Sequence, residues 1–80
     1  MSQIAEAVLY RDRSREMHRL ESAVRNRLNG RLRNFQLMLL SDGLVLQGEV
    51  YTFYAKQLAQ HAIMEMTDMP ILSNDIVVIS

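Results

Sequence analysis

The side chains of this sequence that are best suited to chemistry are its arginines, because eight of them lie among the first 33 residues. Arg11, Arg15 and Arg19 are spaced four apart, so on a helix they align along one face. A second group consists of Arg25, Arg27, Arg31 and Arg33. A guanidinium group can bind two phosphate oxygens at once, whether on a lipid headgroup or on a nucleic acid. The candidate residues for binding an anionic surface are therefore Arg11, Arg15, Arg19, Arg31 and Arg33.

The net charge is zero, but the charges are distributed unevenly along the chain. Up to Arg33 the arginines outnumber the acidic residues by four, whereas beyond Arg33 the acidic residues outnumber Lys56 by four. Three interpretations fit this asymmetry: a solvated helix face, a basic arm for an anionic partner, or self-association through complementary halves. Nucleic-acid binding ranks behind them, because aromatic side chains for base stacking are few and a Gly-x-x-Gly loop is absent.

Catalytic and metal-binding patterns are weak in this sequence. There is no cysteine, which excludes disulfides, thiolate metal sites and thiol nucleophiles. His61 and Glu65 are four apart and supply two ligands, whereas a metal site normally needs three or four. His18 lies on a different predicted helix, and no phosphate-binding glycine loop or nucleophile elbow is present. We expect no enzymatic activity, no cofactor and no metal.

Three aromatic residues form a second candidate patch, namely Tyr51, Phe53 and Tyr54. They lie at the start of a predicted helix. We expect Tyr54 in the core and Phe53 exposed beside Tyr51. Such a pair either contacts a membrane or a partner, or is exposed incidentally.

The first predicted helix runs from about residue 15 to residue 28. Ser14 is a suitable N-cap, and Met17, Leu20, Val24 and Leu28 recur on one face. Asn29-Gly30 supplies the left-handed residue that commonly ends a helix. Residues 1–13 are expected to form a flexible or weakly helical arm, because Arg11-Asp12-Arg13 interrupts any apolar stripe.

A β-hairpin is predicted next, with a strand at 35–41, a turn at Asp42-Gly43 and a returning strand at 44–50. Phe35, Leu37 and Leu39 alternate with Gln36, Met38 and Leu40, so one face of the first strand packs on a helix and the other is partly covered. Gly48 inside the second strand predicts a bulge or a close helix-to-sheet approach.

The remaining elements are a second helix and a third strand. Thr52 is the expected N-cap, and the apolar stripe consists of Tyr54, Leu58, Ala62 and Met66, widened by Ala55, Ala59 and Ile63. Pro70 ends this region, and residues 75–79 form a strand that lies parallel to one strand of the hairpin. The predicted fold class is α+β, a two-layer αββαβ arrangement with a three-stranded mixed sheet packed by two helices.

The hairpin turn Asp42-Gly43 is followed by Leu46-Gln47-Gly48-Glu49-Val50, and Ala59 stands eleven positions after Gly48. Asn74 opens the final run, Asn74-Asp75-Ile76-Val77-Val78. This spacing of small and polar residues resembles the BON domain family. Asp68 occupies a position where the family usually has glycine, so the turn before Met69 must be made differently.

The resemblance implies an αββαβ module over residues 14–80, behind the arm at 1–13. BON domains are usually bacterial, often periplasmic, and associated with phospholipid surfaces or partner proteins rather than with catalysis. This chain shows no signal peptide and no apolar run long enough to span a membrane, so its location is cytoplasmic by default. We expect a non-enzymatic binding module for an anionic phospholipid surface or a protein partner. The alternative is a self-associating structural module.

Overall fold

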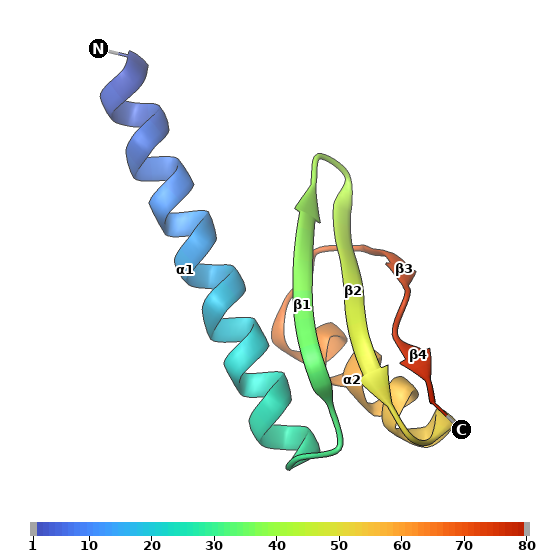
Figure 1. Cartoon of the computed structure of the whole chain (residues 1–80). Coiled ribbons are helices and arrows are strands. Elements are labelled where there is room, and N and C mark those ends of the chain that lie inside the picture. The colour runs from blue at the N-terminus through green and yellow to red at the C-terminus, as the bar shows by residue number, and fades with distance from the viewer. Residues whose placement is uncertain (1, 80) are drawn as a thin grey trace.

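The computed structural model describes the backbone of residues 2–79 and the side chains of residues 15–79. Over this range the elements are α1 (Ser2–Leu28), β1 (Arg33–Leu40), β2 (Gly43–Val50), α2 (Phe53–Met66), β3 (Ile71–Asn74) and β4 (Val77–Val78). β2 is central, with β1 antiparallel on one side and β3 and β4 parallel on the other (Figure 1). The predicted α+β class and αββαβ order are confirmed, except that the third strand is divided in two.

Both helices cover the same face of the sheet. Phe35 and Leu37 of β1 are buried in one core with Leu20 and Val24 of α1. The same core contains the α2 residues Ala55, Ala59, Ala62 and Ile63. On the opposite face of β1, Gln36, Met38 and Leu40 are exposed. The alternation predicted for β1 is therefore correct, and one face of the sheet is left open.

Helix α1 is longer than predicted, because it begins at Ser2 rather than near residue 15. Ser14 lies inside the helix, so its assignment as an N-cap is wrong. The stretch from Ser2 to Leu28 contains no glycine or proline and is rich in alanine, glutamate and arginine, which favour helix without an apolar stripe. The C-terminal end is as predicted, with Asn29 and Gly30 both at positive φ. A domain boundary between residues 13 and 14 stays a prediction.

The hairpin turns one residue earlier than predicted. Leu40 pairs with Gly43, so the turn residues are Ser41 and Asp42. Gly43, at φ 155°, is the first residue of β2, and a Cβ atom there would collide with the carbonyl oxygen of Pro70. The N–H of Leu44 donates to that same carbonyl at 2.8 Å. Glycine is thus required for the close approach of the segment leading into β3, and not for the turn.

Of the two alternatives predicted at Gly48, a bulge or a close approach of a helix, the bulge is confirmed. Arg33 pairs with Glu49 and Gln36 with Gln47, which leaves two residues of β1 opposite Gly48 alone. A Cβ atom at Gly48 would lie 3.1 Å from the carbonyl oxygen of Arg33 and 3.3 Å from the Cα of Phe35. The close neighbour is therefore β1 and not a helix. This bulge fixes where Arg33 lies relative to the end of β2.

Helix α2 begins as predicted, since Thr52 Oγ1 accepts a hydrogen bond from the N–H of Ala55 at 3.0 Å. Its buried face consists of Ala55, Ala59, Ala62 and Ile63, and the small side chains of the three alanines allow the helix to lie close to the sheet. The assignment of Tyr54 to the core is wrong, because this side chain is 63% exposed. The core-facing stripe is centred on the alanines, and Tyr54 falls to one side of it.

The predicted strand at 75–79 is replaced by β3 and β4, which both pair with β2 in the expected parallel sense. The break between them is held by Asn74. Its Nδ2 donates to the carbonyl of Lys56 and to Gln60 Oε1 at 3.3 and 3.1 Å, and its Oδ1 accepts from the N–H of Ile76 at 3.2 Å. Asn74 therefore joins the interrupted edge of the sheet to α2.

The turn before Met69 contains Asp68 at the position where BON domains usually have glycine. A hydrogen bond to the side chain of Thr67 stabilises this turn. Thr67 Oγ1 accepts a hydrogen bond from the N–H of Met69 at 3.2 Å.

Neither helix in the described part of the chain is both long enough and apolar enough to cross a bilayer.

Candidate functional site

The arginines predicted to bind an anionic surface do not form a single patch. Arg15 and Arg19 are exposed on α1, whereas Arg31 and Arg33 follow its C-terminal end. Arg19 is nine residues from the last residue of the helix, which corresponds to about 13 Å along the axis. The side chain of Arg11 lies outside the described residues.

Arg19 is engaged by a neighbour on its own helix. Its Nη2 donates to both carboxylate oxygens of Glu16 at 2.8 Å. This hydrogen bonding and the charge of Glu16 raise the pKa of Arg19 above its usual value. Because the carboxylate of Glu16 offsets the charge of Arg19, this pair presents a weaker positive field to an anionic partner than an unpaired arginine would.

Two other arginines of the basic half are used within the fold. Arg25 Nη2 donates to the carbonyl of Phe35 at 2.8 Å, and Arg27 Nη1 lies 2.6 Å from Glu65 Oε2 on α2. The acidic excess of the second half is thus partly neutralised within the same molecule. The charges of Arg27 and Glu65 therefore join α1 to α2 within one molecule.

Arg33 has a different partner, the exposed Tyr51. Arg33 Nη1 donates to the hydroxyl oxygen of Tyr51 at 2.9 Å. This hydrogen bond, with a smaller contribution from the nearby carboxylate of Glu49, raises the pKa of Arg33 above its usual value. The bond engages one nitrogen of a guanidinium that carries five N–H donors in total. Arg33 therefore keeps both its charge and donors for a further ligand.

One contact, the hydrogen bond from Arg33 to Tyr51, connects part of the arginine set with the aromatic patch. We call these two residues and their exposed chain neighbours, Arg31, Phe53 and Tyr54, the aromatic–arginine surface. The side chains of Tyr51, Phe53 and Tyr54 are 57%, 63% and 63% exposed, respectively, and the ring of Tyr51 lies beside Arg33. Arg33 begins β1 and Tyr51 follows the last residue of β2, so their contact lies at the end of the sheet where β1 begins and β2 ends, the lower end in Figure 1.

Local structure explains why these side chains meet. The bulge opposite Gly48 pairs Arg33 with Glu49, and Asn34 Nδ2 donates to Glu49 Oε1 at 2.8 Å across the same two strands. The chain then passes from Val50 through Tyr51 to the Thr52 cap, which places Phe53 at the first turn of α2. The sequence indicated each patch, but the 18-residue separation of Arg33 and Tyr51 carries no periodic pattern that would reveal their contact.

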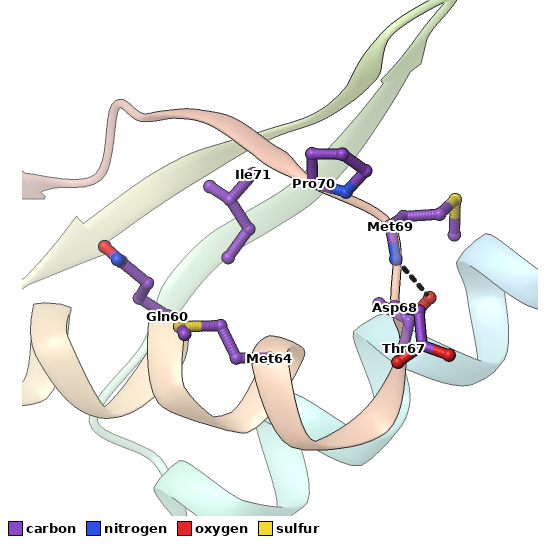
Figure 2. Close-up of a pocket in the computed structure, with 7 residues that line it drawn as sticks. All are labelled: Gln60, Met64, Thr67, Asp68, Met69, Pro70 and Ile71. Atoms are coloured by element: carbon purple, nitrogen blue, oxygen red, sulfur yellow. Dashed lines mark hydrogen bonds between the residues drawn. The ribbon is translucent and has the colours of Figure 1, made fainter.

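A hollow of about 390 Å³ lies between the C-terminal half of α2 and the segment leading into β3 (Figure 2). Gln60 and Met64 line it from α2, and residues 67–71 line it from the other side. Asp68 is the only carboxylate or other titratable group in this lining. The hollow therefore lacks the convergent polar groups that would orient a small molecule or a reaction.

Within residues 15–79, no three or more histidine, aspartate or glutamate side chains lie close enough together to hold a metal ion. Glu65, which the sequence placed four residues after His61, forms its ion pair with Arg27.

Comparison with protein-family models, curated proteins and solved structures found no significant match to this chain. The resemblance to the BON family therefore stays a prediction.

Proposed function

We propose that this chain is a non-enzymatic, BON-like binding module that docks on an anionic phospholipid surface through the aromatic–arginine surface. The observation that supports this most is the hydrogen bond from Arg33 to Tyr51, which places a cation beside an exposed ring. Phe53 and Tyr54, which are equally exposed, extend the apolar part of this surface.

The chemistry of these residue types matches the region where a membrane meets water. Tyrosine rings are enriched at the level of lipid headgroups, and guanidinium groups bind phosphate oxygens. Each basic residue near an anionic surface contributes about 1 kcal/mol of attraction. Arg31 and Arg33 alone would give weak, reversible binding, to which the partial insertion of Phe53 adds the burial of apolar surface.

Vesicle co-sedimentation tests this proposal with a matched pair of variants. Vesicles of phosphatidylcholine are compared with vesicles containing phosphatidylglycerol, at low salt. R31Q/R33Q should lose most of the binding to anionic vesicles. The control variant R15Q/R19Q removes the same charge from α1 and should retain the binding to anionic vesicles. Equal losses in the two variants would show that only the total charge matters. If the wild-type protein bound both kinds of vesicle equally, the proposal would be wrong.

Self-association is a second candidate function, because the open face of the sheet is partly apolar. Met38, Leu40, Leu72 and Val77 are 44%, 45%, 46% and 58% exposed. A second copy of this chain, which carries the same face and opposite charges in its two halves, is the partner that this face fits. Sedimentation velocity of wild-type protein tests this candidate, and a monomer at high concentration would exclude it.

A further inference from the structure

The outer edge of β1, on the side away from β2, is bonded by two side chains of α1. The N–H of Leu37 donates to Glu21 Oε2 at 2.8 Å, and the carbonyl oxygen of Phe35 accepts from Arg25 Nη2 at 2.8 Å. Glu21 and Arg25 lie 3.8 Å apart, and the side chain of Glu21 is only 13% exposed. One carboxylate and one guanidinium thus occupy the positions where a neighbouring strand would place a carbonyl and an N–H.

Helix α1 packs on the core-facing side of β1 through Leu20 and Val24. Beside the β1 edge, a hollow of about 570 Å³ remains between the two elements, with Met17, Glu21 and Arg25 on one side and Phe35 and Leu37 on the other. The side chains of Glu21 and Arg25 reach the backbone groups of the β1 edge next to this hollow. The polar pair thus bonds the edge at Phe35 and Leu37, where the packed part of the helix supplies no backbone partner.

The sequence of β1 explains why an open edge would be harmful. Residues 35–40, Phe-Gln-Leu-Met-Leu-Leu, contain no charge and no proline, and they already adopt a strand. Identical segments of this kind pair readily with one another when their edges are free. Proteins commonly protect such edges with charged side chains or by covering them with another element.

We infer that Glu21 and Arg25 act as a side-chain substitute for a strand, and that the partner they exclude is β1 of a second copy of this chain. The second copy is the fitting partner because an antiparallel pair centred on Leu37 uses the same residues on both sides, which is the symmetry of a twofold dimer. The uncharged segment offers no like-charge repulsion against such pairing. The aromatic–arginine surface takes no part in this contact, so the inference is independent of the proposed function.

Sedimentation velocity over a range of concentrations tests this inference. E21A/R25A should show a weight-average mass that rises with concentration above that of wild type, toward roughly twofold or more. The control is E16A/R19A, which removes a glutamate–arginine pair of the same helix that is bonded at 2.8 Å but reaches no strand. The control should sediment like wild type.

Two further variants assign the association to the β1 edge. E21Q keeps an oxygen that accepts from the N–H of Leu37, so it should sediment like wild type. Adding Q36K to E21A/R25A places like charges on adjacent identical strands and should restore the wild-type mass, while Met38 and the other apolar residues of the open face stay unchanged. A folded E21A/R25A protein with wild-type mass at every concentration would overturn the inference, and so would association that Q36K leaves unchanged.

Amide hydrogen exchange provides a readout that does not depend on the variant folding well. In dilute wild-type protein the Leu37 amide should exchange slowly, because Glu21 accepts its hydrogen bond. Rapid exchange at Leu37, at a rate similar to that of exposed loop amides, would show that the edge is not closed and would overturn the inference.

Discussion

The hydroxyl oxygen of Tyr51 accepts a hydrogen bond from Arg33 at 2.9 Å, although 18 positions separate the two residues in the sequence. Tyr51 follows the last residue of β2, and Arg33 is the first residue of β1. The contact joins the two ends of the hairpin and places a cation beside the exposed ring of Tyr51. It is the feature that gives the aromatic–arginine surface its mixed character.

Replacing Tyr51 by phenylalanine should weaken binding to anionic vesicles less than R31Q/R33Q does. The ring remains for insertion, but Arg33 loses the acceptor that orients it. Because both side chains are exposed, unfolding in urea should change by no more than about 0.5 kcal/mol. A loss as large as that of R31Q/R33Q would mean that the tyrosine hydroxyl contacts the lipid itself.

Vesicle binding should be almost constant between about pH 6 and about pH 9, because the cations are arginines. The pKa of Arg33 is raised, so the charge and the bond to Tyr51 are present at all lower pH and lost only far above neutrality. Added salt should weaken binding across this range by screening. A fall in binding as the pH rises through neutrality would contradict the assignment of the attraction to arginine side chains.

Gly43→Ala should destabilise the protein more than Gly30→Ala. Both residues have positive φ, which costs an alanine about 1–2 kcal/mol. A Cβ atom at Gly30 meets nothing within 4 Å, whereas at Gly43 it collides with the backbone of Pro70. The collision should add about 1–3 kcal/mol to the loss, measured by urea denaturation. Equal losses at the two positions would show that β3 can move away from β2.

Asn74→Ala should lower the free energy of unfolding by about 1–3 kcal/mol, because the N–H of the buried Ile76 loses its acceptor. Asn74→Asp retains an oxygen for Ile76 but loses the donor to Lys56 and Gln60, so its loss should be smaller. Asn26→Ala, at an exposed position of α1, serves as the control and should be nearly neutral. A neutral Asn74→Ala would mean that the break between β3 and β4 is not held by this side chain.

The sequence by itself determined the elements whose causes are local. The Thr52 cap, the Asn29-Gly30 helix end and the alternation of Phe35 and Leu37 all follow from residue type and spacing. At Gly48 the sequence indicated a bulge or a close helix, and the structure decided for the bulge. The αββαβ order and the parallel third strand follow from these elements. A strand that follows a crossover helix pairs parallel to a strand that precedes the helix, through a right-handed connection.

Only the tertiary structure decided which side chains meet across long separations. Arg33 with Tyr51, Glu21 with Leu37 and Arg27 with Glu65 are contacts between elements, and their geometry depends on the bulge and on how α1 and α2 lie on the sheet. The same reason explains the errors at Tyr54 and at the hairpin turn. Close approach, of α2 to the sheet and of Pro70 to Gly43, determined those positions, and no local pattern encodes such distances.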